Sequence, residues 1–364
     1  MKIFIIFSIF FLTSVHLFAQ SKKVEVADTI RYNSSIEAVS DTIPNLEIFG
    51  DETPMDLTLK YDIKSFIKNK MKGEYLDAEL FIHYKDYTVT KNIRLKARGN
   101  NRRQECFFPP IFLNFKTDPI KSTELKGFKK IKLVTHCSSS KIYTDYILKE
   151  YLIYKLYNVL TDYSFRVKLL NMNYVDTSKR KKNYQRFGVL IEPVELLAKR
   201  TNSIEIESEV VRGENVIEEK ADLVSLFNYM IGNTDWRIKG GHNMKFLKSL
   251  KEITPFVIPV PYDFDYSGFV SAHYAFPQIW TNIEDVKQRE YMGYCRSTDE
   301  EYLKTIQKFI DKKDEIFKTI DSFSYLNEHE RKSLHKYIES FYNLAEKPEK
   351  LLYFLKNECR TIDF

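Results

Sequence analysis

The chain has 364 residues, of which 43% are hydrophobic, so it can bury the core of one large domain or two small ones. Its formal net charge is +6, and 50 acidic residues are interleaved with 56 basic ones. That balance is too mild to predict nucleic-acid binding, because nucleic-acid-binding domains gather basic charge on one face. Function therefore has to be sought in local motifs.

The first twenty residues predict a secretory signal peptide. Lys2 precedes an apolar run that starts at Ile3, and cleavage is expected after Ala19 or Gln20. An uncleaved membrane anchor is the alternative, although the apolar run is barely long enough to span a bilayer. We expect an exported chain, in the periplasm, at the cell surface or secreted, with no stable membrane span after cleavage. Residues 21–45 lack periodicity and predict a flexible leader.

Hydrophobic alternation predicts β-strands in the first half of the chain. Apolar residues at every second position favour strands over residues 55–61, 76–84 and 89–97, with a short amphipathic segment over 63–71. Successive strands with short connections predict an antiparallel sheet.

A basic segment, Arg98-Gly-Asn-Asn-Arg-Arg, follows the third of these strands. Gly99 and the asparagines tolerate positive φ, so the backbone can curl with its amides exposed while Arg98 supplies positive charge. This pattern is typical of a phosphate-facing loop. The alternative is an exposed basic hairpin tip.

A lysine on a predicted strand and a glutamate on a predicted helix form the next candidate pair. Residues 128–134 alternate again and carry Lys132, and residues 142–159 have helical apolar spacing with Glu150 in the middle. Both residue types are usually solvated surface groups.

The cysteines are the next feature. Four of them in an oxidising context allow zero to two disulfides, with three connectivities for two: Cys106, Cys137, Cys295 and Cys359. We favour Cys106–Cys137, because each of these residues follows a predicted core strand. No spacing suggests a zinc site, and the G-x-S-x-G and H-E-x-x-H motifs of common hydrolases are absent from the sequence.

Farther along, strands are predicted over 165–174 and 187–192, and Glu192 lies where a hinge between two lobes is expected. A helix over 216–231 then leads directly into Asn233-Thr-Asp235.

Four polar groups stand next to apolar or aromatic residues: Asp235, Asn243, Asp263 and Asp265. Apolar residues from Ile253 to Val260 predict a buried strand that ends at Pro261. If the backbone stays extended beyond it, Asp263 and Asp265 point the same way. Such oxygen donors suit Mg²⁺ better than zinc. The alternative is a metal-free turn with an asparagine cap.

These segments resemble a known family. The pattern Asn233-x-Asp235, then His242-Asn243, then Pro261-Tyr-Asp-Phe-Asp-x-x-Gly268 is similar to that of the CotH-like (spore-coat protein H) atypical kinases. The Arg98-Gly-Asn segment also matches that family, and the resemblance extends faintly over residues 90–270.

The resemblance implies an exported kinase that transfers the γ-phosphoryl of ATP to a protein hydroxyl with Mg²⁺ or Mn²⁺. In that interpretation Asp235 is the catalytic base, and the remaining roles fall to two sets of residues. Arg98, Lys132 and Glu150 bind the nucleotide, and Asn243, Asp263 and Asp265 bind the metal. In kinases a strand lysine orients the nucleotide and pairs with a helix glutamate, so the resemblance implies that Lys132 pairs with Glu150.

The implied architecture is an α+β, two-lobed protein-kinase-like fold with an antiparallel N-terminal sheet and a helical C-terminal part. We expect an N-lobe at about 46–192 and a C-lobe at about 193–364, in which residues 270–297 contact the acceptor. Helices are predicted from Thr298 to Ile320, around Leu334–Leu344 and after Pro348. The alternative function is a non-catalytic exported pseudokinase or a surface-binding module.

Overall fold

A computed structural model describes residues 46–50, 52–99, 101–115, 129–179, 183–251 and 253–362. The signal peptide and the leader predicted for residues 1–45 lie outside these ranges. No helix within the ranges is long and apolar enough to cross a membrane.

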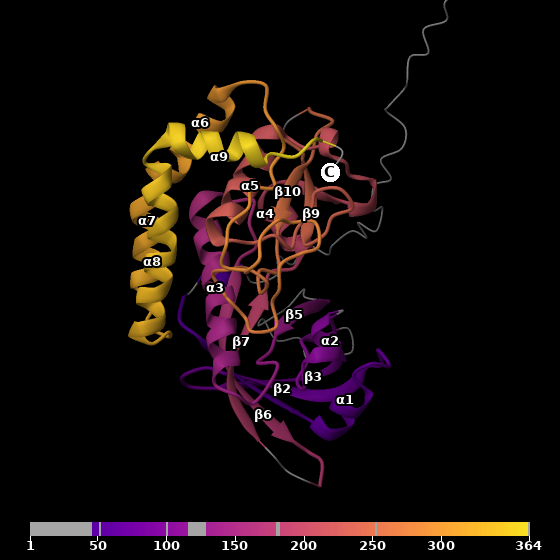
Figure 1. Ribbon diagram of the computed structural model, residues 1–364. Coiled ribbons are helices and arrows are strands. Elements are labelled where there is room, and N and C mark those ends of the chain that lie inside the picture. The colour runs from indigo at the N-terminus through magenta and orange to yellow at the C-terminus, as the bar shows by residue number, and fades with distance from the viewer. Residues whose placement is uncertain are drawn as a thin grey trace, which may run out of the picture. The chain divides into compact units, whose positions relative to one another are not determined.

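A closed barrel of seven strands forms the first part of the described chain (Figure 1). Around the barrel the strand order is β1-β2-β3-β4-β5-β7-β6; β1 and β6 pair in parallel, and every other neighbouring pair is antiparallel. The strands are β1 (Met55–Tyr61), β2 (Leu76–His83), β3 (Thr88–Ala97), β4 (Ile111–Asn114), β5 (Lys130–Val134), β6 (Val167–Asp176) and β7 (Tyr184–Ile191).

The prediction of a two-lobed kinase-like fold with an antiparallel N-terminal sheet is therefore wrong. The parallel pairing of β1 with β6 closes the sheet, and it sets Leu57 opposite Met172 and Leu59 opposite Tyr174. All four side chains are buried. Alternation along one strand shows which face is buried but carries no information on whether distant strands join.

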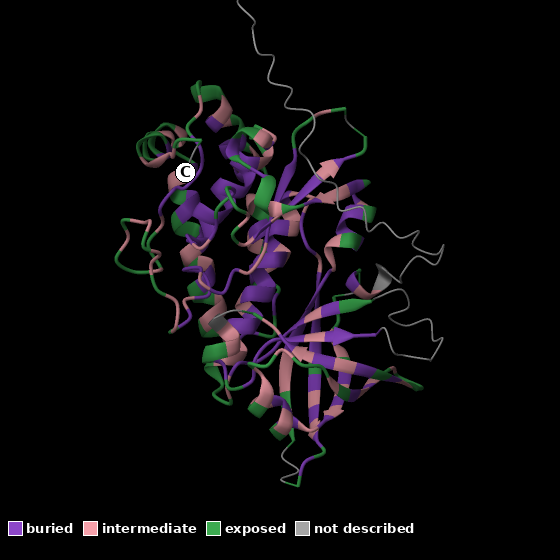
Figure 2. Ribbon diagram, turned by 90° about the vertical axis from the view of Figure 1, so that its right-hand side faces the viewer, coloured by how far each residue is buried: buried purple, intermediate pink, exposed green. Residues whose placement is uncertain are grey.

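The barrel interior is filled by the inward-facing residues of its strands. Figure 2 shows buried positions alternating with more exposed ones along these strands. Fully buried leucines come from five strands: Leu59, Leu80, Leu95, Leu113 and Leu133. Because a small barrel is filled by side chains, this interior is a core and not a channel.

Helix α3 (Ile142–Leu160) connects the barrel to the rest of the structure. It packs against β6 and β7 on one side and against α7 (Lys313–Asp321) on another. More than half of its residues are buried, as expected of a helix that is covered on several faces. It can therefore present side chains to both neighbours.

A second, three-stranded sheet has the order β10-β9-β8. It consists of β8 (Ser203–Ile206), β9 (Met244–Ser249) and β10 (Ile258–Pro261), and α5 (Glu218–Ile231) packs on β10. The strand predicted from Ile253 begins only at Ile258, and Ile253 and Phe256 are exposed.

The C-terminal part is helical, as expected, with α6 (Asp299–Asp311), α7, α8 (Glu328–Ala345) and α9 (Pro348–Glu358). Thr298 and Glu301 form a capping box at the start of α6. The single helix predicted up to Ile320 is in fact two, which break at Lys312. The remaining short elements are η2 (Leu46–Phe49), α1 (Ile63–Asn69), α2 (Asn101–Glu105), α4 (Val194–Arg200), η3 (Ser208–Val210) and η4 (Gly213–Asn215).

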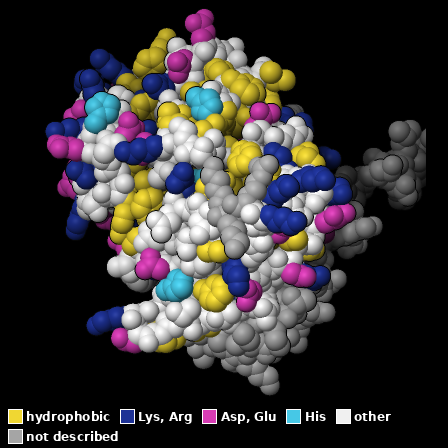
Figure 3. Space-filling model, turned by 90° about the horizontal axis from the view of Figure 1, so that it is seen from below, with side chains coloured by type: hydrophobic (Ala, Val, Ile, Leu, Met, Phe, Trp, Pro, Cys, Tyr) yellow, Lys and Arg dark blue, Asp and Glu magenta, His cyan; other side chains and the backbone are white. Residues whose placement is uncertain are grey.

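Two disulfides cross-link the described chain. The favoured pair Cys106–Cys137 is present, and a second disulfide joins Cys295 to Cys359. On the face seen in Figure 3, basic and acidic side chains lie among one another.

Glu192, predicted as a hinge residue, is a buried junction between elements. Its carboxylate accepts hydrogen bonds from the backbone N–H of Arg166 (3.0 Å), from Arg166 Nη2 (3.0 Å) and from Arg200 Nη2 (2.9 Å). The side chain of Glu192 is completely buried, whereas both arginines keep some contact with solvent. The end of β7 is thereby tied to the start of β6 and to α4.

Replacing Glu192 tests this junction. We expect Glu192→Ala to lower the free energy of unfolding by about 3 kcal/mol, because two arginines lose the carboxylate that compensates them. Glu79→Ala is the matched control, since its pair with Lys60 is about 40% exposed on both sides, and it should cost less than about 1 kcal/mol. Urea denaturation measures both, and equal losses would contradict the assigned role of Glu192.

Candidate active site

The turn that follows α5 positions Asp235. Gly232 ends the helix in the left-handed conformation, with φ of 63°, and the buried Asn233 accepts a hydrogen bond from the Asp235 N–H (3.1 Å). Asn233 is held in turn by Asn228, whose side-chain oxygen accepts from Asn233 Nδ2. The Asn-x-Asp motif is thus an Asx turn that fixes the direction of the aspartate.

Asn243 lies directly beside Asp235. Its Nδ2 donates to the Asp235 backbone oxygen (2.7 Å) and to Asp235 Oδ2 (2.9 Å). The eight residues from Asp235 to Asn243 form a loop in which Gly240 and Gly241 have positive φ. An antiparallel β-bridge between Arg237 and His242 closes this loop. The asparagine side-chain oxygen accepts no hydrogen bond within the described ranges, so it is available to a ligand.

His242 belongs to the motif named from the sequence but was given no role there, and it contacts Asp235. Its Nε2 lies 2.8 Å from Asp235 Oδ1. This hydrogen bond to Asp235 raises the pKa of His242. In the sequence, the only indication of this contact was the position of His242 directly before Asn243.

Asp263 and Asp265 follow β10 but do not continue it as an extended strand. Asp263 has a φ of 65°, in the left-handed region, so the expectation that the two carboxylates alternate along a strand is wrong. The Asp263 N–H donates to Tyr154 Oη on α3 (3.0 Å), which anchors the turn. Between the two aspartates, Phe264 is fully buried against Tyr154 and Phe227.

Asp265 is a buried carboxylate with one occupied oxygen. Its Oδ2 accepts from the Tyr274 hydroxyl (3.1 Å) and lies 3.8 Å from Arg102 Nε. Burial, and after it the neighbouring Asp263, raises the pKa of Asp265. A cation that approached the other oxygen would therefore relieve an unfavourable charge.

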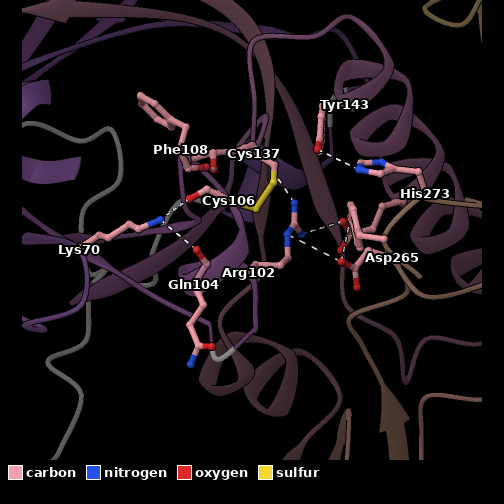
Figure 4. Close-up of a disulfide and its surroundings, with 12 residues drawn as sticks. Lys70, Arg102, Gln104, Cys106, Phe108, Cys137, Tyr143, Asp265 and His273 are labelled. Atoms are coloured by element: carbon pink, nitrogen blue, oxygen red, sulfur yellow. Dashed lines mark hydrogen bonds and ion pairs between the residues drawn. A yellow bond between two sulfur atoms is a disulfide. The ribbon is translucent and has the colours of Figure 1, made fainter. Parts of the chain in front are cut away.

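Glu150 pairs with Arg102, not with Lys132 as predicted. Arg102 Nη1 lies 3.4 Å from Glu150 Oε2, and Figure 4 shows Arg102 between the disulfide and Asp265. Burial raises the pKa of Glu150, and Arg102 opposes that rise. Arg102 occupies this place because its α2 helix follows β3 closely, which the sequence signalled only as a basic loop.

Lys132 forms no ion pair with any described residue. Its ammonium group lies 4.7 Å from the centre of the Tyr262 ring, and the nearby Arg98 stacks over Phe112. Burial, followed by repulsion from Arg98, lowers the pKa of Lys132 to about 8, and Asp263 acts in the opposite direction. Two cations that share a partly buried space without a bonded carboxylate favour an anionic ligand.

The predicted site residues thus converge from distant segments. The charge of Asp263 acts on Lys132, Glu150 and Asp265, and the charge of Asp235 acts on Asp265. The barrel supplies Arg98 and Lys132, α3 supplies Glu150, and the second sheet with its flanking turns supplies the others: Asp235, Asn243, Asp263 and Asp265.

The donor set fits a small divalent cation. Asn243 Oδ1, the Asp263 carboxylate and Asp265 Oδ1 are oxygen donors with no hydrogen-bond donor of their own in the described part of the chain. No group of three or more His, Cys, Asp or Glu side chains that could hold a metal ion occurs within the described ranges. Mg²⁺ is usually bound by one or two carboxylates together with water and phosphate oxygens, so this mixed set suits it.

A cavity of about 630 Å³ lies elsewhere, on the outer side of the barrel, and its lining includes Thr58, Asn173 and Phe187. None of the predicted site residues lines it. We place the candidate site at the aspartates, because buried charges converge there. No protein-family model, curated protein or solved structure matches the chain.

The low pKa of Lys132 predicts how anion binding depends on pH. The ammonium form, which attracts phosphate, predominates below pH 8 and is lost above it, so affinity for ATP should fall by about tenfold between pH 7 and pH 9. Isothermal titration calorimetry at constant ionic strength measures this fall. Lys132→Arg keeps its charge throughout and should give a much flatter profile. A wild-type profile as flat as that of the variant would contradict the assignment.

Proposed function

We propose that the chain is an exported, metal-dependent phosphotransferase that moves the γ-phosphoryl of ATP to a protein hydroxyl. The observation that carries the proposal is Lys132, a largely desolvated amine next to Arg98 that has no bonded carboxylate among the described residues and lies within reach of the charge of Asp263. A bound anion would compensate the positive charges of Lys132 and Arg98, and a bound cation would compensate the aspartates. A nucleotide polyphosphate with its metal ion supplies both the anion and the cation.

The absence of a kinase fold does not weaken this argument. Phosphoryl transfer depends on positioning and on charge stabilisation around the transferred group, and the same chemistry recurs on unrelated folds. The resemblance of the Asn233-x-Asp235 and Asp263-x-Asp265 segments to CotH-like kinases supports the same reaction. The two disulfides support export, since such cross-links persist in oxidising compartments.

The residues divide the work as follows. Arg98 and Lys132 would hold the phosphates, while Asn243, Asp263 and Asp265 would hold Mg²⁺ or Mn²⁺. When bound, the metal neutralises the charge that develops on the phosphate oxygens.

Asp235 accepts the proton of the acceptor hydroxyl. Its carboxylate is held by His242 and Asn243, and each of its oxygens keeps a lone pair for that proton. The side chain is 16% exposed, so an acceptor can reach it from solvent. The two hydrogen bonds fix its orientation for the transfer.

Asp235→Asn tests the assignment of the base. The amide keeps the size of the side chain but cannot take the proton, so turnover should fall by about 10²–10⁴-fold while the dissociation constant for ATP stays near the wild-type value. Radiolabel transfer to a generic protein acceptor and calorimetry measure the two quantities. Asp56→Asn, an exposed change on β1, is the matched control and should alter neither. Parallel loss of binding and turnover in the Asp235 variant would assign that residue a structural role.

A further inference from the structure

Arg102 is a largely buried cation that hydrogen-bonds to two segments and lies in ion-pair range of a third. Its side chain is 13% exposed. Nη1 lies 3.4 Å from Glu150 Oε2 on α3, Nη2 donates to the Thr135 carbonyl at the end of β5 (3.4 Å), and Nε lies 3.8 Å from Asp265 Oδ2 (Figure 4). Burial acts to lower the pKa of Arg102, but Tyr274, Asp265 and Glu150 together raise it above its usual value. The guanidinium therefore stays charged and links all three segments.

The α2 helix that carries Arg102 cannot hold it in place by itself. A five-residue helix is too short to be stable alone, because nucleation is costly and few hydrogen bonds follow. The helix is followed directly by Cys106, whose N–H donates to the Arg102 carbonyl (3.0 Å) and whose sulfur is bonded to Cys137. Lys70 Nζ adds a hydrogen bond to the Cys106 carbonyl (2.7 Å).

The disulfide joins the two segments that must stay together for Arg102 to remain bonded. Cys137 lies two residues beyond Thr135, whose carbonyl accepts from Arg102, and the Phe108 N–H donates to the Cys137 carbonyl (2.8 Å). The disulfide therefore keeps α2, which carries Arg102, next to the end of β5, where the Thr135 carbonyl accepts its hydrogen bond. Cys295–Cys359 has no such relation to the site, since it joins the C-terminal end of α9 to the segment before α6.

We propose that Arg102 is the positioning cation of the site and that the Cys106–Cys137 disulfide keeps it there. Arg102 and Tyr274 both lie at Oδ2 of Asp265, so Oδ1 would be the oxygen available to a metal ion. Arg102 also takes Glu150 as its partner, which leaves Lys132 free for phosphate. The effect of the disulfide on activity rests on the proposed phosphotransferase function. Because the disulfide holds Arg102, that activity depends on an oxidising environment.

The first experiment compares the two disulfides. Cys106→Ala/Cys137→Ala removes a cross-link between residues 31 positions apart, and Cys295→Ala/Cys359→Ala removes one between residues 64 positions apart. The longer loop predicts at least as large a fall in Tm for the second variant. Only the first variant should raise the Mn²⁺ concentration for half-maximal turnover, by about tenfold or more. Equal metal dependence in the two variants would overturn the proposal.

A second experiment tests the positioning role of Arg102 directly. Arg102→Lys keeps a positive charge and should retain part of the wild-type affinity for Mn²⁺. Arg102→Met has no charge and should lose that affinity. Calorimetry of Mn²⁺ binding, combined with separate kcat and KM values for ATP, distinguishes this from general destabilisation. If Arg102→Met bound Mn²⁺ as tightly as wild type, the role of Arg102 would be refuted.

A third experiment does not depend on any activity. In a double-mutant cycle on Tm, Arg102→Met should cost less in the Cys106→Ala/Cys137→Ala background than in wild type, by about 3 °C or more, because the arginine is already displaced. Additive effects would show that the disulfide does not hold Arg102. If the cycle shows coupling but the wild-type protein transfers no phosphate, the proposed function fails while the structural link between disulfide and arginine stands.

Discussion

Carboxylates buried beside the barrel need cations, and Arg102 meets that need. Glu150 and Asp265 are almost completely removed from solvent, and the positive charge of Arg102 opposes the rise in pKa that burial imposes on each carboxylate. One planar guanidinium can act on both, since it presents several donors in fixed directions. The contact joins α2, α3 and the turn after β10.

The barrel contributes Arg98 and Lys132 to the candidate site, and the second sheet with its turns contributes Asn243 and Asp263. Closure of the barrel holds β5 rigidly, so Lys132 projects toward Tyr262, the residue before Asp263, from a fixed base. The second sheet and its turns hold Asn243 and Asp263 from the opposite direction, both with left-handed backbones that Asn and Asp tolerate better than most residues. Backbone strain of this kind often occurs at functional sites, where surrounding contacts maintain it.

Local patterns in the sequence predicted many of the elements, because each depends on near neighbours. The strands β1, β2 and β3, the helix α3 and the capping box of α6 follow from alternation, helical spacing and cap residues. Barrel closure did not follow, because the pairing of β1 with β6 joins residues more than a hundred positions apart. Such long-range pairing leaves no signal in either strand alone.

The candidate site was predicted as a set of residues but not as a set of contacts. Asp235, Asn243, Asp263 and Asp265 were chosen from their motifs, and the structure brings them together with Lys132 and Glu150. The predicted pairing of Glu150 with Lys132 was wrong, because Glu150 pairs with Arg102. Arg102 lies on α2, a helix that the sequence suggested to be a loop. Which of several cations reaches a buried carboxylate depends on tertiary geometry.

The most direct test of the account is a crystal structure with Mn²⁺ and a non-hydrolysable ATP analogue, in which anomalous scattering locates the metal. We predict a metal peak within coordination distance of Asn243, Asp263 and Asp265, with the terminal phosphates beside Lys132 and Arg98. The account would be contradicted if metal or nucleotide bound in the cavity on the outer side of the barrel while Asp263 and Asp265 bound no metal.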